Sequence, residues 1–280
     1  MTSELDDPPH ARDLLKKHGL APKRSFSQNF LVQPGATARI ADAAAALGQE
    51  VVELGPGLGA LTHALLARDC HVLAVELDRD MIRVLGEELG SHPALEIREG
   101  DAAELDLAAY SNACGTKLVV TGNLPYQATG AILRQVVRHR EVLAGAVLMV
   151  QREVRDRLVA APSTKEYGAL TVFTQAGFEV DTVCRLKPGS FFPPPQVDSA
   201  VVRLTPLDPP RAEETPTFQA TVRASFQMRR KTLRNALRPM GDPDRSARAA
   251  DDARIDLGRR GETLSVEEFG RLAACWDALA

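Results

Sequence analysis

The stretch VVELGPGLGALT, residues 51–62, passes from an apolar run through alternating glycines into a helical pattern. Residues 51–54 are typical of a short buried strand and residues 58–67 of a helix. The glycines let the backbone turn sharply and let a ligand come close to the chain; they are Gly55, Gly57 and Gly59. This order indicates an α/β sheet with a binding loop at the end of a strand.

The glycine loop by itself leaves three interpretations open. Gly55, Gly57 and Ala60 fit the dinucleotide fingerprint G-x-G-x-x-G/A, and Glu76 stands near the distance expected of a ribose-binding acid. A nicotinamide or flavin enzyme therefore competes with an enzyme that binds another adenosine-containing cofactor. A tight turn without a ligand explains less, because three alternating glycines exceed what a turn needs.

Strand-like and helix-like patterns alternate around this loop, from about residue 34 to residue 150. We expect helices at 33–47, 58–67, 78–89 and 129–139, and strands at 51–54, 71–77, 95–98, 118–121 and 145–150. We also expect helices at 154–159 and 168–176 and strands at 180–186 and 200–204. Such alternation predicts a parallel sheet covered by helices on both faces.

Three acidic residues stand in or just after the predicted strands: Glu53, Glu76 and Asp101. The carboxyl ends of parallel strands share one edge, where ligands bind in open α/β folds. A carboxylate such as Glu76 can accept from both hydroxyls of a ribose, and Asp101 can accept from an adenine amine. The alternative is that Asp78 and Asp101 cap helices and that Glu76 is solvated.

Four motifs occur in an order and spacing that resemble the class I S-adenosylmethionine-dependent methyltransferases. They are LGPGLGALT (54–62), AVELD (74–78), EGDA (99–102) and NLPY (123–126). More narrowly, the chain resembles the small-subunit ribosomal RNA adenine N6,N6-dimethyltransferase family (KsgA-type). Further stretches carry this resemblance: KRSFSQNFLV (23–32), VQREVRDRLVA (150–160), KEYGALTVFTQ (165–175), SFFPPPQVDSAVVRL (190–204) and QMRRKTLRNAL (227–237).

The resemblance covers almost the whole chain and implies a Rossmann-like class I methyltransferase fold. That fold has a mostly parallel seven-stranded sheet, and the family adds a small all-α C-terminal domain. S-adenosylmethionine is the implied cofactor, and the residues implied to contact it are Asn29, Leu31, Gly55, Gly57, Glu76, Asp101 and Asn123. The chain departs from the family's usual residues at Phe26, Ser27, Gln127 to Gly130 and Gln196. These departures remove no side chain that the chemistry needs, and they leave open a change in loop packing or in substrate contacts.

The NLPY motif follows a predicted strand and suits methyl transfer to an adenine amine. That nitrogen is a poor nucleophile, so the task is mostly positioning. We expect the Asn123 side-chain oxygen and the Leu124 carbonyl to accept from the amine, and Pro125 to stiffen the loop. Tyr126 would stack on one face of the base and Phe191 on the other. The alternatives are Asn123 as a helix cap and the two phenylalanines, Phe191 and Phe192, as a hydrophobic plug.

The chain is expected to divide into a catalytic domain, 1–207, and a helical RNA- and ribosome-binding domain, 208–280. The proline-containing segment 206–216 reads as a linker. We expect helices at 218–237, 250–255 and 265–279, the last opened by a capping box of Ser265 and Glu268.

The segment between Gln219 and Pro239 has six basic residues and no acidic one. We predict that its RNA-binding residues are Arg223, Arg229, Arg230, Lys231 and Arg234. In a continuous helix Arg230, Arg234 and Arg238 would share a face. A solvated helix face is the alternative, although acidic residues usually intersperse there. Lys23, Arg24 and the arginines of 152–157 would extend the basic track.

The bulk properties are those of an ordinary soluble globular protein, and we expect it in the cytoplasm. The 280-residue chain is 44% hydrophobic and 25% charged, with a net charge of −3. Its N-terminus lacks the features of a signal peptide, and no apolar stretch is long enough for a membrane span. The four cysteines are widely spaced, so we interpret them as reduced residues that fill apolar positions, and we expect no metal site.

The expected function is dimethylation of the exocyclic N6 of two adjacent adenosines near the 3′ end of small-subunit (16S) rRNA. The resemblance implies an immature 30S-type subunit as the substrate, and we expect the enzyme to act as a monomer. Three alternatives stay open: a macrolide-resistance enzyme acting on large-subunit rRNA, an assembly factor without catalysis, and a nicotinamide oxidoreductase.

Overall fold

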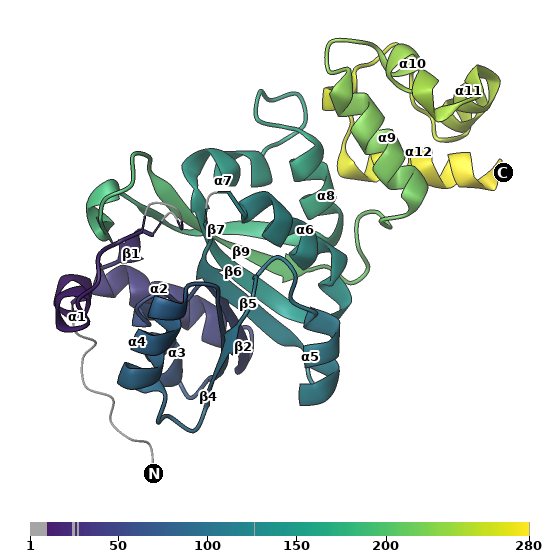
Figure 1. Ribbon diagram of the computed structural model, residues 1–280. Coiled ribbons are helices and arrows are strands. Elements are labelled where there is room, and N and C mark those ends of the chain that lie inside the picture. The colour runs from purple at the N-terminus through teal and green to yellow at the C-terminus, as the bar shows by residue number, and fades with distance from the viewer. Residues whose placement is uncertain (1–9, 24–25, 27, 126, 280) are drawn as a thin grey trace. The chain divides into compact units, whose positions relative to one another are not determined.

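The computed structural model describes residues 10–23, 26, 28–125 and 127–279, whose path Figure 1 traces. The chain forms two compact units. One comprises Met1–Arg155 and Asp181–Thr205, and the other Asp156–Val180 and Pro206–Ala280. The predicted functional division falls between residues 207 and 208, whereas the second compact unit also takes in Asp156–Val180. The division of catalysis and RNA binding at that point stays a prediction.

A seven-stranded sheet has the order β4-β3-β2-β5-β6-β9-β7. Its strands are β2 (Glu50–Leu54), β3 (His71–Glu76), β4 (Leu95–Glu99), β5 (Leu118–Asn123), β6 (Leu143–Gln151), β7 (Phe178–Leu186) and β9 (Ser199–Pro206). The first five strands in this order, β4, β3, β2, β5 and β6, are parallel to their neighbours. The next strand, β9, runs antiparallel to β6. The predicted mostly parallel seven-stranded sheet is therefore confirmed.

Helices cover both faces of this sheet. They are α2 (Pro34–Ala45), α3 (Ala60–Leu66), α4 (Arg79–Leu89), α5 (Leu107–Cys114) and α6 (Thr129–Arg138). The strands proceed outward from β2 to β4 in one direction and from β5 to β6 in the other, so right-handed crossovers put their helices on opposite faces. Ile40, Leu65 and Leu85 bring α2, α3 and α4 into one core cluster, and Figure 1 shows α5 and α6 on the other side.

The strand order reverses between β2 and β5, which are neighbours in the sheet but not in sequence. In open α/β sheets, ligands bind at such a switch point, beyond the carboxyl ends of the strands. The two strand ends come very close here, because a Cβ on Gly122 would lie 2.3 Å from the Leu54 carbonyl oxygen. Gly122 also has a φ of 152°, so glycine is required just before Asn123.

The N-terminal segment adds elements that periodicity did not predict. α1 (Ala11–Lys17) buries Leu14 in a cluster with Leu58 and Met81. β1 (Phe30–Leu31) pairs antiparallel with β8 (Phe191–Phe192). Two-residue strands have no period to detect, and they form only because the fold brings these distant segments together. α5 was also missed.

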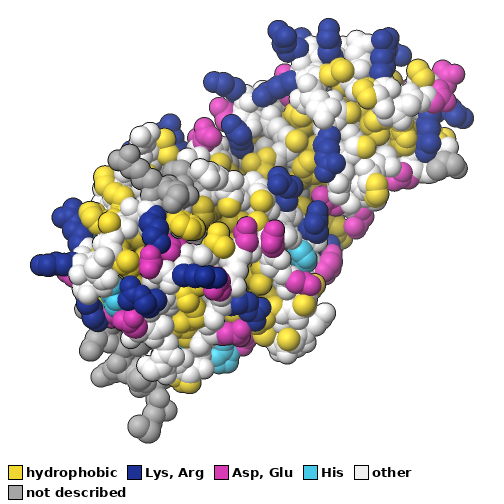
Figure 2. All heavy atoms as spheres, viewed as in Figure 1, with side chains coloured by type: hydrophobic (Ala, Val, Ile, Leu, Met, Phe, Trp, Pro, Cys, Tyr) yellow, Lys and Arg dark blue, Asp and Glu magenta, His cyan; other side chains and the backbone are white. Residues whose placement is uncertain are grey.

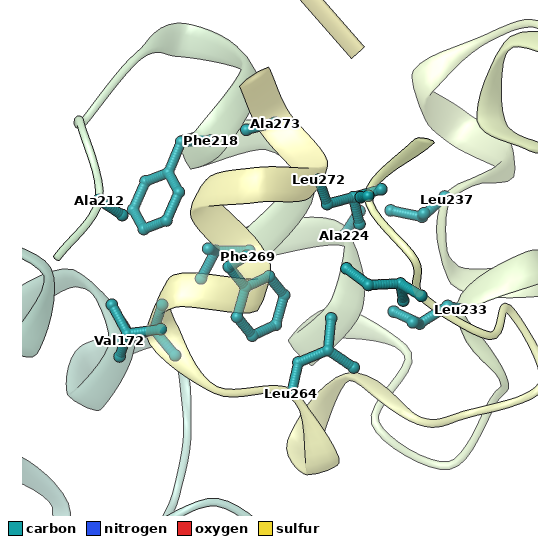
Figure 3. Close-up of a cluster of buried hydrophobic side chains, with 14 of the residues drawn as sticks. Val172, Ala212, Phe218, Ala224, Leu233, Leu237, Leu264, Phe269, Leu272 and Ala273 are labelled. Atoms are coloured by element: carbon teal, nitrogen blue, oxygen red, sulfur yellow. The ribbon is translucent and has the colours of Figure 1, made fainter. Parts of the chain in front are cut away.

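The second unit is helical. Its helices are α8 (Ala169–Gly177), α9 (Pro216–Gln227), α10 (Leu233–Ala236), α11 (Pro243–Asp252) and α12 (Val266–Ala278); α7 (Arg152–Leu158) leads into it. Short 3-10 helices lie at Arg238–Met240 and Gly261–Thr263 in this unit, and at Arg140–Val142 and Pro188–Ser190 in the first unit. Figure 3 shows Val172 of α8 beside Phe218 and Phe269, within one buried cluster. α8 therefore completes the core of the C-terminal helices.

The capping box at the start of α12 is confirmed. The Glu268 amide donates to Ser265 Oγ at 3.2 Å, and the Ser265 amide donates back to the Glu268 carboxylate at 2.8 Å. The predicted helix at 250–255 begins too late, since α11 starts at Pro243 behind an Asp242 cap and ends at Asp252.

The predicted continuous helix over 218–237 is wrong. α9 ends at Gln227, and the chain then forms backbone bonds with residues 257–260. Thr232 makes an antiparallel bridge with Arg260, and the Leu233 amide donates to the Arg259 carbonyl at 2.8 Å. These tertiary bonds draw the backbone out of the helix, overriding local propensity. Arg230, Arg234 and Arg238 consequently do not share a helical face.

No helix in the described part of the chain combines the length and apolar character that crossing a bilayer requires. Cys70 and Cys184 are buried, as the apolar-filler interpretation predicts. Cys114 is exposed near the end of α5, so that interpretation is wrong for it.

Candidate active site

A cavity of about 960 Å³ lies at the switch point, near the upper end of the range for ligand pockets. It gathers every residue that the resemblance assigned to the cofactor: Asn29, Leu31, Gly55, Gly57, Glu76, Asp101 and Asn123. Leu124, Pro125 and Phe191 line the same cavity. Tyr126, the predicted stacking residue, lies outside the described residues. Segments that are distant in sequence thus meet at one place.

The Glu76 carboxylate, at the end of β3, is held by backbone donors. Its Oε2 accepts from the Gly57 amide at 3.1 Å, and its Oε1 accepts from the amides of Leu77 and Asp78 at 2.9 Å. Burial raises the pKa of Glu76, and the three amides counteract that rise in part. Because a carboxylate oxygen has two lone pairs, Oε2 can accept a further hydrogen bond from a ligand hydroxyl.

The other two acids differ from Glu76 and from each other. Glu53 is 1% exposed, and its Oε2 accepts from Thr62 Oγ1 at 2.6 Å. Burial raises the pKa of Glu53 to about 7. Asp101 is exposed, and its Oδ1 accepts from the Ala103 amide at 2.8 Å. Asp101 therefore caps a turn and not a helix, since the N-cap of α5 is Asp106; the helix-cap interpretation is wrong for Asp101, which also lines the cavity.

The glycine loop lies against the N-terminal segment. Gly57 has a φ of 57°, and a Cβ there would meet the Phe30 ring at 3.1 Å. The neighbouring β1 residues pair with β8, Phe30 opposite Phe192 and Leu31 opposite Phe191. A larger residue at position 57 would push this strand pair away, so the loop's glycine and the N-terminal segment fit each other.

The NLPY turn begins at the end of β5. The Asn123 side-chain amide donates from Nδ2 to the Asn29 carbonyl oxygen at 2.9 Å. The Leu124 amide donates to the Met149 carbonyl at 3.1 Å. The helix that follows has Ala128 at its N-cap position, so the alternative interpretation of Asn123 as a helix cap is wrong.

The two phenylalanines of β8 have different surroundings. Phe191 is 5% exposed and belongs to the core cluster that α2, α3 and α4 form with the strands, and it also lines the cavity. Phe192 is partly buried against the α1 cluster, and the Arg12 guanidinium lies 4.6 Å from its ring centroid. A base could reach Phe191 only through the cavity.

Sequence reasoning missed Leu77 and the anchors of the N-terminal segment. Leu77 is 53% exposed and lines the cavity directly after Glu76. The signal that could have found it is its place directly after the strand-end acid Glu76, at the sheet edge where ligands bind in open α/β folds. Lys23, which was expected to extend the basic track, instead forms ion pairs with Asp78 and Asp80 at 2.6 Å each.

Basic side chains gather on the helices of the second unit, as Figure 2 shows for the face in view. Arg223 on α9, Arg230 and Lys231 in the turn, and Arg234 on α10 are exposed. Arg229 differs, since its Nε donates to Glu262 Oε2 at 2.6 Å and its Nη2 to the Lys165 carbonyl at 2.8 Å. Arg229 is therefore tied within its own unit.

The sheet order, the antiparallel β9 and the cavity at the switch point define a class I methyltransferase. The chain belongs to a family within this class, the ribosomal RNA adenine dimethylases, because the profile described as "Ribosomal RNA adenine dimethylase" matches residues 19–276. Methyltransferases of this kind use S-adenosylmethionine. The chain is thus an enzyme of the adenine dimethyltransferase family.

Named relatives resemble the chain over nearly its full length. It is 43% identical to "Ribosomal RNA small subunit methyltransferase A" of Myxococcus xanthus, over 93% of both chains. The protein of the same name from Geobacter metallireducens is 40% identical over 95% of this chain and 99% of its own length.

Two solved structures share the fold. A dimethyladenosine transferase from Plasmodium falciparum superposes with a TM-score of 0.74 at 25% identity, covering 87% of this chain and 95% of its own. The 23S rRNA methyltransferase ErmE has a TM-score of 0.67 at 28% identity, covering 89% and 100%.

Proposed function

We propose that the enzyme dimethylates the exocyclic N6 of two adjacent adenosines near the 3′ end of small-subunit rRNA. Its substrate in this proposal is an immature 30S-type subunit in the cytoplasm, and it acts as a monomer. The observation that carries the proposal is similarity over 93% of the chain, at 43% identity, to a relative named as a small-subunit rRNA methyltransferase. The large-subunit methyltransferase ErmE is 28% identical.

The residues of the cavity fit S-adenosylmethionine. Glu76, fixed by three backbone amides, would accept from the ribose hydroxyls through its carboxylate. Leu77 offers an exposed apolar surface next to it for the adenine, and Asp101 an acceptor for the adenine amine. Gly55 and Gly57 let the ligand come close to the loop. The remaining proposed contacts come from Asn29, Leu31 and Asn123.

The cofactor supplies a methyl group already activated by a sulfonium centre. The residues of the chain have mainly to orient the adenine amine, whose lone pair is delocalised into the ring. The nitrogen would become acidic as the new bond to the methyl forms and would then release its proton to solvent, so no strong general base is needed. The Asn123 side-chain oxygen and the Leu124 carbonyl would accept its hydrogens and direct the lone pair. Pro125 would keep that turn rigid, while Tyr126 and Phe191 would cover the faces of the base.

Four exposed basic residues of the C-terminal unit are the proposed phosphate contacts: Arg223, Arg230, Lys231 and Arg234. Arg229 was predicted with them, but its guanidinium is bound to Glu262 and to the Lys165 carbonyl. We propose that Arg229 acts on RNA through the turn that it stabilises.

The test is transfer of labelled methyl from S-adenosylmethionine to immature small subunits, followed by mapping of the modified base. We expect N6,N6-dimethyladenosine at two neighbouring positions near the 3′ end. Purified large-subunit RNA is the parallel substrate, and methylation there with none on small subunits would favour the macrolide-resistance alternative. Absence of transfer to either, with subunit binding retained, would favour the assembly factor. Calorimetry with NAD tests the remaining alternative.

A further inference from the structure

We infer that a polar clamp around Asp78 sets the orientation of the Asn123 amide, and that Lys23 and Gln28 are positioning residues for methyl transfer. The inference rests on the proposed function, in which the Asn123 oxygen faces the target amine. Neither Lys23 nor Asp78 lines the cavity. They act at a distance, through the backbone of Asn29.

The first step is the hydrogen bond between Asn123 and Asn29. A carbonyl oxygen can only accept, so the Asn123 amide must turn its nitrogen toward the Asn29 carbonyl, 2.9 Å away. Its oxygen then points the other way. An amide flipped by 180° would set two oxygens against each other and would offer hydrogens to an amine that needs acceptors. The Asn29 carbonyl thereby selects the productive orientation.

The second step is how that carbonyl is held in place. Gln28, directly before Asn29, donates from Nε2 to Asp78 Oδ2 at 2.7 Å. Directly after Asn29, Phe30 and Leu31 pair with β8. Asn29 is therefore fixed from both sides, by a side-chain bond on one and by strand pairing on the other.

The third step links the clamp to Lys23. Lys23 Nζ donates to Asp78 Oδ1 at 2.6 Å, and its backbone amide donates to Gln28 Oε1 at 2.8 Å. A second carboxylate, that of Asp80, lies 2.6 Å from the same ammonium. Both acids raise the pKa of Lys23. Because Asp78 is 3% exposed, losing Lys23 would leave a buried carboxylate short of its charged partner, and the clamp would loosen.

Asp78 also connects the clamp to the cofactor side of the cavity. Its backbone amide donates to Glu76 Oε1 at 2.9 Å, and its carboxylate caps α4 by accepting from the Asp80 amide at 3.0 Å. One residue thus joins the acid proposed for the ribose to the segment that orients Asn123. Cofactor geometry and amine geometry share this anchor.

The test compares Lys23→Met with a matched control, Lys17→Met. Lys17 also ties the N-terminal segment to α4, through Glu88 at 2.7 Å, but among the described residues none of its ion pairs or hydrogen bonds joins it to Asp78 or Gln28. In single-turnover methyl transfer with saturating cofactor and subunits, we expect about a tenfold slower rate for Lys23→Met and less than about a twofold change for Lys17→Met. Affinity for immature subunits should not change. Lys23→Arg should restore most of the rate.

Equal rates for the two methionine variants would overturn the inference. Asp78→Asn is the second variant, since asparagine keeps the α4 cap but weakens both clamp bonds, and it should slow transfer as Lys23→Met does. If Lys23 had a purely structural role, Lys23→Met would lower the thermal stability of the protein, and the rate of methyl transfer and the affinity for immature subunits would fall together.

An NMR readout keeps the inference separate from the proposed function. In protein labelled with 15N-asparagine, the Asn123 side-chain signal is identified by its loss in Asn123→Asp. We expect that signal to shift or broaden in Lys23→Met and to stay unchanged in Lys17→Met. If the wild-type enzyme transferred no methyl to small subunits, the proposed function would fail, while this signal would still decide the clamp. An unchanged signal in Lys23→Met contradicts the clamp.

Discussion

The cavity at the switch point and the basic surface of the C-terminal unit are built in opposite ways. In the cavity, Glu53, Glu76 and Asn123 are each held by hydrogen bonds. On the basic surface, Arg230 and Lys231 are exposed, and no ion pair among the described residues holds them. Burial without a partner costs free energy, whereas an exposed charge is solvated. Substitutions in the cavity should therefore change structure and chemistry together, and substitutions on the surface should change binding alone.

The largest effect is expected for Glu76→Ala. It removes the proposed ribose acceptor and leaves the amides of Gly57, Leu77 and Asp78 without their shared carboxylate. We expect calorimetry to show S-adenosylmethionine binding weakened by about a thousandfold, with methyl transfer lost. Glu99→Ala at the exposed end of β4 is the control and should bind normally. Normal cofactor binding by Glu76→Ala would remove that carboxylate from the site.

Glu53 should make stability depend on pH. Its pKa rises from the ordinary 4.5 to about 7 in the folded protein. Above pH 4.5 the unfolded chain ionises first, so the wild type loses stability as the pH rises toward 7. The loss is on the order of 3 kcal/mol. Glu53→Gln keeps an acceptor for Thr62 and has no proton to lose.

Urea unfolding at a series of pH values tests this expectation. The difference between Glu53→Gln and the wild type should grow in favour of the variant from pH 5 to pH 8 by roughly 3 kcal/mol and then level off. The change of this stability difference with pH is the decisive quantity, because the substitution itself alters the free energy of unfolding by an amount that is the same at every pH. A difference that stays flat across this range would show that Glu53 ionises normally in the fold.

The cavity could be predicted from sequence because its residues belong to local patterns. A strand, a glycine loop and an acid at the end of the next strand can each be recognised from a few consecutive residues. Parallel strands then bring their carboxyl ends to one edge of the sheet. Glu76, Asp101 and Asn123 were found in this way. The partner of the Asn123 amide was not, since Asn29 meets it only through the pairing of β1 with β8.

The C-terminal unit shows where local patterns fail. Residues 218–237 have a helical composition, but the Leu233 amide bonds to the Arg259 carbonyl instead of continuing α9. Similarly, Arg229 reads as one of a run of basic residues, and only its bonds to Glu262 and to the loop at Lys165 distinguish it from Arg230. Both facts depend on residues distant in sequence, which composition does not reveal.

Arg229 and Arg230 are adjacent, yet their substitution should have different effects. Arg229→Ala breaks a bond to Glu262 and two to backbone carbonyls, so it should lower the free energy of unfolding by about 1–2 kcal/mol. Arg230→Ala should stay within about 0.5 kcal/mol of the wild type, as exposed positions usually do. Chemical denaturation measures both. Equal stabilities for the two variants would mean that the Arg229 contacts contribute little in solution.

The smallest effect is expected for single charges on the basic surface. If Lys231 contacts a phosphate, Lys231→Ala should weaken binding to immature subunits by about three- to tenfold and lower the slope of log affinity against log salt by about one. Arg271→Ala, an exposed charge on α12 outside the proposed contacts, is the control and should leave the slope unchanged. Cofactor affinity should be the same in all three proteins, because the cavity lies in the other compact unit. Should the slope instead fall in Arg271→Ala and not in Lys231→Ala, the RNA would lie along α12. The exposed surface that binds RNA would then be that helix, and not the turn that holds Arg230 and Lys231.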